Sequence, residues 1–453
     1  MRALWRRLGI ALALGGCSVT QFDLPGTQGD EAAYAAAFPY YAEYCALSQI
    51  SKKPGFGADI RGEIGGHAVF YLNGACRDDA AGYPVLRMCT PDVPADGTRM
   101  GGVGLSMNAH FSNAKFVAVP GRDFFFGGGL PPYTGLTRAD YTAVQQQARR
   151  LGIYGGVEFH AEVFDDMPPG TAREDHKYEV SAATDYAIAM GRGRYCARVP
   201  VKRAQMSRMV DFLNAENAPY RNRQAVFRWS VFRDNCIHLA HNALAAAGVW
   251  DEWRSHSSLL LAMLDFPVPR NEFVNIMRRT NDTRLLDPDR LYRDAAARQA
   301  LDDFATLPLT PGALAESRPP LQPNAVYDTE LKLIFYDEPI LGRYQAWSDA
   351  IFADPRRTDL AANLAWFDEL YRQVLLQRRP LAEWQKDPDH RTAEFAAFYK
   401  RFYTVLGRQQ MEASKARALP WSRQVRDTPS HDGTAPPEPG FPKGRNWPVT
   451  KGG

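Results

Sequence analysis

The sequence predicts an α+β fold in which short strands dominate the first half and helices dominate the second. Short apolar runs with β-branched and aromatic residues, which are typical of strands, lie between residues 65 and 119. Helical spacing of apolar residues begins at residues 201–214 and returns over residues 343–415. Hydrophobic residues make up 45% of the 453 residues and charged residues 23%, which indicates a globular chain with room for two domains.

The N-terminus has the layout of a secretory signal peptide. Three arginines precede an apolar run over residues 8–14, and small residues follow. This run is shorter than the roughly 20 residues that cross a bilayer. Residues 14–17 read LGGC and resemble the bacterial lipobox. The resemblance implies cleavage before Cys17, lipid on that residue, and attachment to a membrane, which we expect to be the outer membrane facing the periplasm. The alternative is a short anchor with a chance cysteine.

The elements expected after this leader follow from local patterns. Residues 31–50 are rich in alanine and tyrosine and predict a helix. Helices are also expected over 137–151 and over 201–214, where Met206, Met209 and Leu213 share one face. Residues 121–133 carry three phenylalanines followed by glycines and prolines and are expected to form a loop. The expected strands are 68–72, 83–88, 103–108, 114–119 and 157–164.

We therefore expect five segments along the chain. A signal peptide (1–16) precedes a polar tether (17–30) and an α+β domain (31–265). A mainly helical region (266–419) and a disordered tail rich in proline, glycine and charge (420–453) complete the chain.

The charge balance argues against a protein that covers nucleic acid. Lys and Arg number 54 and Asp and Glu 51, and three of the positive charges lie in the leader. We expect no cofactor either, because the glycines at 127–129 lack the setting of a nucleotide-binding loop.

Export changes the interpretation of the six cysteines, because disulfides form in oxidising compartments. If Cys17 carries lipid, an odd number remains and one thiol is left over. One possible pairing joins Cys76 to Cys89 and Cys45 to Cys196, leaving Cys236. The sequence alone leaves this pairing open.

Cys236 opens a predicted helix. Asp234 or Asn235 can cap it, and Gly248 can end it. A cysteine in the first turn lies beside backbone N–H groups and the positive end of the helix dipole, which favour the nucleophilic thiolate. The same N–H groups are suited to stabilising an oxyanion.

Such a nucleophile needs a base, and His67 is the best candidate. It follows two glycines and opens an apolar strand, which would hold the imidazole rigidly. A third polar residue should orient the ring, and Asn108 or His110 on a neighbouring strand is expected to do so. His160 is a weaker choice.

These two motifs resemble a known superfamily. GGHAVFYL over residues 65–72 and FRDNCIHLAHNAL over 232–244 are similar to the permuted branch of the papain-like NlpC fold, which includes lecithin–retinol acyltransferase-like proteins. The resemblance covers roughly residues 60–250. It implies an antiparallel sheet with packed helices, His67 as base, Cys236 as nucleophile and a polar residue on the strand after the histidine strand.

The expected function is that of a lipid-anchored cysteine hydrolase or acyltransferase of the cell envelope. Asn235, Ile237 and His241 would support the oxyanion and the pocket. The bond would be an amide, ester or thioester, and peptidoglycan peptides or lipid acyl groups are the available substrates.

Other functions remain open at this stage. A non-catalytic envelope lipoprotein that binds a partner or a cell-wall component is the main alternative. A metal site at His238 and His241 is conceivable, but no second ligand cluster accompanies them, and we expect no metal. Cys236 could also be a small buried hydrophobic residue.

Overall fold

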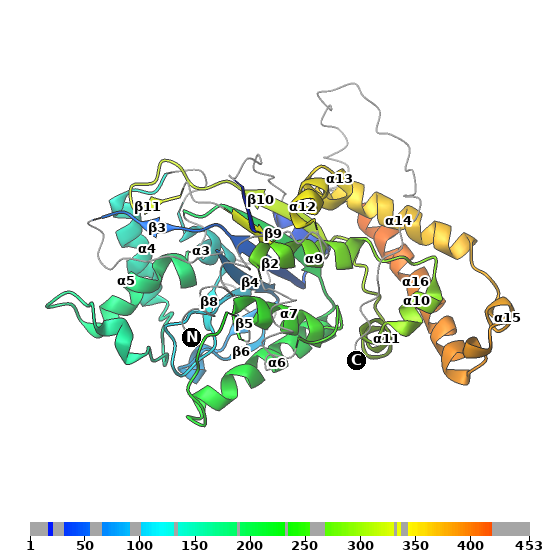
Figure 1. Ribbon diagram of the computed structural model, residues 1–453, viewed down its shortest axis with the longest axis horizontal. Helices are drawn as coiled ribbons and strands as arrows, with labels where there is room; N and C mark the ends of the chain where they lie inside the picture. Colours follow the sequence, from blue (N-terminus) through cyan, green and yellow to red (C-terminus); the bar gives the residue numbers. More distant parts are fainter. Residues whose placement is uncertain are drawn as a thin grey trace, which may run out of the picture.

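The fold is described from a computed structural model and has α+β architecture (Figure 1). A central antiparallel sheet lies between two groups of helices, and a further group of helices extends from one side (Figure 1). The structure describes residues 17–20, 31–54, 66–90, 101–130, 135–187, 191–231, 234–253, 268–329, 333–336 and 343–418.

The strands are short, as the sequence predicts. They are β1 (Cys17–Thr20), β2 (Tyr41–Leu47), β3 (Ser51–Lys52), β4 (His67–Asn73), β5 (Ala75–Arg77), β6 (Leu86–Met88), β7 (Gly102–Ser106), β8 (Val117–Pro120), β9 (Arg194–Pro200), β10 (Leu314–Arg318), β11 (Tyr327–Asp328) and β12 (Leu333–Tyr336).

Helices cover the sheet and form most of the C-terminal part. They are α2 (Glu31–Ala37), α3 (Arg122–Gly127), α4 (Arg138–Arg150), α5 (Arg173–Asp185), α6 (Arg203–Arg221), α7 (Cys236–Ala246), α9 (Pro269–Asn281), α10 (Pro288–Arg293), α11 (Ala295–Asp303), α12 (Tyr344–Phe352), α13 (Pro355–Thr358), α14 (Leu360–Leu376), α15 (Leu381–Trp384) and α16 (Ala393–Arg417). Within the described ranges, none has both the length and the apolar character that crossing a membrane requires.

The central sheet has six strands in the order β10-β9-β2-β4-β7-β8, and every neighbouring pair is antiparallel. The pairing of β2 with β4 and β9 is one-to-one along its whole length. Side chains therefore alternate strictly between the two faces. This alternation decides which residues can meet.

We call one face of the sheet the α5 face. It carries His67, Val69 and Tyr71 of β4, and Ser106 of β7 lies opposite Val69. Helix α3 packs here: a side chain in place of Gly104 would lie 2.2 Å from the ring of Phe125. Helix α5 lies on the same face, because the Ser106 hydroxyl contacts Thr184 near its end.

The opposite face is the α7 face. It carries Tyr44 of β2 and Phe70 of β4, which lie opposite each other. The Tyr44 hydroxyl donates to the carbonyl of Pro269 in α9 over 2.9 Å, and the ring of Tyr195 packs on Phe273 of the same helix. Helix α7 joins α9 through a contact between His241 and Glu272. Figure 1 shows α7 and α9 on one side of the sheet and α4 and α5 on the other.

The C-terminal helices have a core of their own. Phe367 of α14 and Phe402 of α16 are fully buried in it, together with leucines from α10 and α11. The helical spacing of apolar residues predicted over 343–415 thus gives a buried face here.

Several local predictions are confirmed. The strands expected at 68–72 and 103–108 are β4 and β7, and the helices expected at 137–151 and 201–214 are α4 and α6. The strand expected at 114–119 is β8, which starts three residues later than expected, and residues 83–88 contribute β6. The disordered tail at 420–453 lies outside the described residues, as does the signal peptide.

Four predictions were wrong. Residues 31–50 do not form one helix, because β2 follows α2 after Pro39 and is buried on both faces. The predicted loop at 121–133 begins with α3, whose three phenylalanines are buried over the sheet. Residues 157–164 form an isolated bridge and a short 3-10 turn in place of a strand. The expected tether at 17–30 starts with a strand, β1, which pairs with β12.

The central sheet also takes a strand from beyond the boundary that we expected at residue 265. Strand β10, at residues 314–318, is the edge strand of the central sheet and pairs with β9. Helix α9 packs on β2 and β9 of the same sheet. The sheet layer therefore takes segments from both of the regions that the sequence seemed to separate.

Candidate functional site

The predicted helix start at Cys236 is confirmed. The Asn235 side-chain oxygen accepts from the N–H groups of Ile237 at 2.9 Å and His238 at 3.3 Å, and its amide donates to Val231 O at 2.7 Å. Cys236 is the first residue of α7, is partly exposed and lies outside both disulfides. The backbone therefore places this thiol where the helix dipole favours a thiolate.

The same cap corrects the predicted role of Ile237. Its N–H is committed to Asn235, as is that of His238. Two of the first-turn donors expected to hold an oxyanion are thus already bonded. An N-cap of this kind stabilises the helix by about 1 kcal/mol.

The two disulfides are the pairing that the sequence left open. Cys45 of β2 and Cys196 of β9 lie directly opposite each other and are joined. Cys76 of β5 is joined to Cys89. Both bridges fit the oxidising compartment that the leader implies.

His67 is the first residue of β4 and is buried, as the strand prediction implied. Its Nε2 lies 3.0 Å from Ser106 Oγ on β7. That hydroxyl also lies 2.8 Å from the carbonyl oxygen of Thr184 and 3.2 Å from Asp185 Oδ1. The polar residue that contacts the histidine from the next strand is therefore Ser106.

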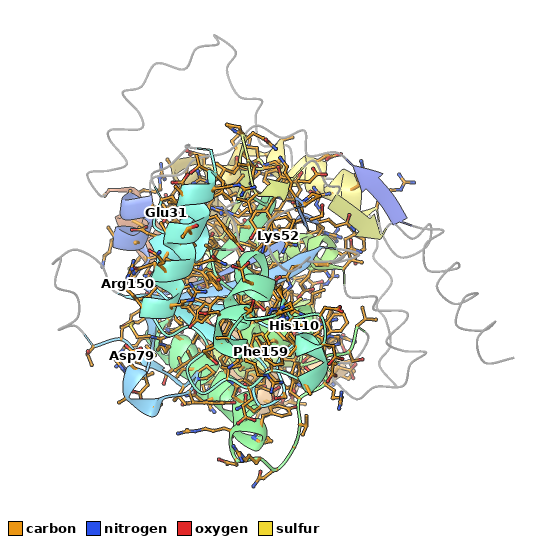
Figure 2. All side chains as sticks on the ribbon, turned by 90° about the vertical axis from the view of Figure 1, so that its left-hand side faces the viewer. Glu31, Lys52, Asp79, His110, Arg150 and Phe159 are labelled. Carbon is orange, nitrogen blue, oxygen red and sulfur yellow. A yellow bond between two sulfur atoms is a disulfide. The ribbon has the colours of Figure 1, made fainter. Side chains whose placement is uncertain are left out.

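Asn108 and His110, the residues expected to orient His67, contact α5. Asn108 Nδ2 lies 3.2 Å from Asp185 Oδ2 and 3.3 Å from Ser181 Oγ. His110 Nδ1 lies 3.3 Å from the same Ser181 hydroxyl, and its ring packs beside Phe159 (Figure 2). Ser106 was missed, although the strand expected at 103–108 would already put Ser106 and Asn108 on one face.

His160, the weaker candidate base, is joined to His110 through its backbone N–H, which donates to the His110 carbonyl oxygen over 2.8 Å, but its ring has another partner. Its Nε2 is 3.0 Å from the carbonyl oxygen of Phe227.

Asp185 is the centre of this polar cluster. It is fully buried and lies 3.0 Å from the Tyr154 hydroxyl in addition to Ser106 and Asn108. Burial raises the pKa of Asp185 to about 7, although the hydrogen bonds from Tyr154, Asn108 and Ser106 oppose the change. We call His67, Ser106, Asn108, Tyr154 and Asp185 the α5-face cluster.

The structure does not bring Cys236 and His67 together. His67 points to the α5 face, where it meets Ser106. Cys236 opens α7, which joins α9 on the opposite face, where the Tyr44 hydroxyl donates to Pro269. Burial first, and then the charges of Glu272 and Cys236, raise the pKa of Tyr44. The sheet thus lies between the predicted nucleophile and the predicted base.

His241 is held on the α7 face. Its Nδ1 lies 2.8 Å from Glu272 Oε1 and its Nε2 lies 3.1 Å from the carbonyl oxygen of Asp251. Its ring stacks between Trp250 and Trp253, with centroids 4.2 and 3.9 Å away. Both ring nitrogens of His241 are therefore engaged on this face, so the ring is fixed between α7 and α9.

His238 has a different environment from His241. Its Nδ1 lies 3.0 Å from Asn235 Oδ1, which accepts, so Nδ1 carries the proton. Burial, with the charges of His241 and Lys115, lowers the pKa of His238 to about 4. The ring is therefore neutral at neutral pH. His238 and His241 face different partners and do not form a pair of metal ligands.

A buried charge network lies on the α5 face beside the Cys45–Cys196 disulfide. Glu43 of β2 pairs with Arg122 at 2.5 Å and Arg198 at 3.2 Å. Arg198 also pairs with Glu316 at 2.5 Å. Glu31 pairs with both Arg122 and Arg198. Within the described ranges, the carboxylate of Glu43 and the sulfurs of Cys45 and Cys196 are the set of possible metal-binding atoms that lie close to one another. Both sulfurs are bonded to each other in the disulfide.

Comparisons with family models, with curated proteins and with solved structures find no match for this chain.

Proposed function

We propose that this chain is an exported, lipid-anchored protein of the cell envelope that acts by binding. One observation carries the proposal. The strand register puts His67 on the α5 face, whereas Cys236 lies with α7 on the other face. A cysteine hydrolase needs its nucleophile and base within hydrogen-bond reach.

The surroundings of each residue support this proposal. His67 is buried against Ser106 and the rest of the α5-face cluster. Ile237 donates its N–H to the helix cap. A base, a nucleophile and an oxyanion hole must converge on one reacting carbonyl. Here His67 contacts Ser106 on the α5 face, and the Ile237 N–H is used by the helix cap.

The leader supports the location. Cys17, where the lipobox resemblance puts the lipid, starts β1, and its backbone pairs with that of Tyr336 in β12. Lipid at this residue would hold the folded part close to the membrane surface. The protein would then present its binding surfaces to molecules of the envelope.

The rate at which a thiol-directed activity probe labels Cys236 tests the proposal. We expect His67→Ala to change that rate by less than twofold, with Cys236→Ser as the blank. His160→Ala is the matched control, because the His160 ring contacts the carbonyl oxygen of Phe227. A tenfold loss of labelling in His67→Ala alone would contradict the proposal.

A cysteine hydrolase or acyltransferase acting on an envelope amide, ester or thioester is the second candidate. The position of Cys236 at the start of α7, partly exposed and outside the disulfides, favours it. Its base would have to come from the α7 face. His238 is neutral there and keeps the lone pair of Nε2, because Nδ1 donates to Asn235.

This second candidate has its own test. It requires hydrolysis of a peptidoglycan peptide or a lipid acyl ester by the wild type and not by Cys236→Ser. It also requires that His238→Gln slow the labelling of Cys236 at least tenfold, while His160→Gln leaves it unchanged. Equal rates in all variants would reject it.

A further inference from the structure

Arg194 lies in an unusual row of residues on the α5 face. In the register of the sheet, Arg194 of β9 is opposite Arg318 of β10 on one side and Leu47 of β2 on the other. Leu47 is in turn opposite His67. Arg318, Arg194, Leu47 and His67 thus form one row across four strands of the α5 face. This row contains two guanidinium groups and no carboxylate.

The Arg194 side chain is buried and poorly satisfied. The residue is only 9% exposed, and its Nε is buried without a hydrogen-bond partner in the described part of the chain. One terminal nitrogen lies 3.5 Å from the carbonyl oxygen of Phe126, which is the limit of a hydrogen bond. The guanidinium carbon lies 4.8 Å from the centre of the Phe126 ring, which is a cation–π contact.

The nearby carboxylates are engaged elsewhere. Glu316 pairs with Arg198 at 2.5 Å through one oxygen and with Arg318 at 2.5 Å through the other. Glu43 pairs with Arg122 and Arg198. Among the described residues, this charge network has three carboxylates and, with Arg194, four guanidinium groups. The carboxylates are those of Glu31, Glu43 and Glu316, and the guanidinium groups are those of Arg122, Arg194, Arg198 and Arg318. Arg194 carries the excess positive charge.

Such a buried cation is costly unless something pairs with it. Burial, with the like charges of Arg318 and Arg122, lowers the pKa of Arg194 to about 10 even though Glu316 and Glu43 oppose the change. It remains charged at neutral pH. A planar guanidinium with an unused Nε–H offers the fork that binds carboxylate or phosphate oxygens.

We propose that Arg194, with Arg318 beside it, binds an anionic group of an envelope molecule, either a carboxylate or a phosphate. This inference rests on the proposed binding function and names the chemistry of its ligand. The terminal carboxylate of a cell-wall peptide and the phosphate of a lipid headgroup are the two sources to be distinguished.

Calorimetric titration of the full chain tests the proposal with defined probes. These are inorganic phosphate, alanyl-alanine, its C-terminal amide, and short-chain phosphatidylglycerol below its micelle concentration. We expect saturable binding of phosphate and a dissociation constant at least tenfold weaker in Arg194→Gln. Arg223→Gln is the control, because Arg223 is an exposed arginine in a single ion pair and should bind as the wild type does.

The probes identify the source of the anion. Binding of alanyl-alanine but not of its amide indicates a peptide carboxylate, and binding of phosphatidylglycerol without alanyl-alanine indicates a lipid phosphate. Arg194→Lys keeps the charge but not the fork and should bind with intermediate affinity.

A stability measurement separates loss of the site from loss of the fold. Because Arg194 has no carboxylate partner in the described part of the chain, we expect Arg194→Gln to keep its urea midpoint in the absence of phosphate, and phosphate to raise the midpoint only of the wild type. No saturable binding to any probe, or equal binding by wild type and Arg194→Gln, would overturn the proposal. The labelling of Cys236 is independent of this result, so the two proposals can fail separately.

Discussion

Replacing Glu43 by glutamine should destabilise the protein by about 3 kcal/mol at neutral pH. Glu43 is fully buried and pairs with Arg122 at 2.5 Å and Arg198 at 3.2 Å. Burial alone would raise the pKa of Glu43, but the two guanidinium groups outweigh it and lower the pKa from 4.5 to about 2. This difference corresponds to about 3 kcal/mol. Breaking a buried ion pair from one side typically costs 3 to 5 kcal/mol, which agrees.

The pH dependence gives a second measurement of the same quantity. Because the folded-state pKa is depressed, the stabilisation is complete above about pH 4.5 and is lost as the pH falls towards 2. Urea unfolding of the wild type and Glu43→Gln should therefore differ most at pH 7 and converge in acid. Glu383→Gln is the control, because Glu383 forms a half-exposed i,i+4 pair with Arg379. A loss below about 1 kcal/mol, or a difference that does not depend on pH, would refute the reasoning.

Four further predictions concern separate parts of the molecule. Burial raises the pKa of Asp185 from 3.8 to about 7, so folding becomes less favourable as the pH rises from about 4 to 7 and this buried acid must ionise. Urea unfolding at pH 8 should therefore show Asp185→Asn to be more stable than the wild type by up to about 4 kcal/mol. Equal stabilities of the two proteins would contradict a buried neutral acid. Removing the Cys45–Cys196 disulfide, which spans 151 residues, should lower the free energy of unfolding by about 5 kcal/mol, and removing Cys76–Cys89, which spans 13, by about 3 kcal/mol. Calorimetric melting of the two double-alanine variants should show the lower melting temperature for the variant without Cys45–Cys196. Asn235→Ala should cost about 1 kcal/mol in urea unfolding, while Asn235→Ser should recover most of the loss. Cys17→Ser should abolish incorporation of labelled palmitate and release the protein from membranes; continued labelling would exclude this lipidation site.

Local patterns in the sequence were enough to predict the elements around the candidate site. Asn235 before Cys236 gives a capped helix wherever that helix packs, because the cap depends on neighbouring residues only. The apolar run with β-branched and aromatic residues after His67 likewise gives strand β4.

The sequence could not determine which face of the sheet each residue occupies. A shift of one residue in a strand moves every side chain to the other face, and nothing near His67 specifies the side that α7 covers. The contact between His67 and Ser106 depends on the register of β4 with β7, which is set by the whole sheet.

Packing also overrode local patterns elsewhere. The three phenylalanines after Arg122 look like an exposed loop in isolation, but Gly104 leaves room for the Phe125 ring against the sheet, and α3 forms there. Strand β10 is a short segment with Glu316 and Arg318 in its sequence. Its pairing with β9 brings Glu316 next to Arg198, and Glu316 also pairs with Arg318, so these charges are compensated inside the fold.

The order of strands in the sheet sets the order in which the chain can fold as it is made. Strand β2, near residue 41, needs β9, near residue 200, and β9 in turn needs β10, which ends at residue 318. Oxidation of Cys45 with Cys196 must therefore wait until about two fifths of the chain has emerged, and the sheet is complete only after about two thirds. Such distant pairings are slow to form, so a long unpaired segment needs protection from aggregation until its last strand arrives.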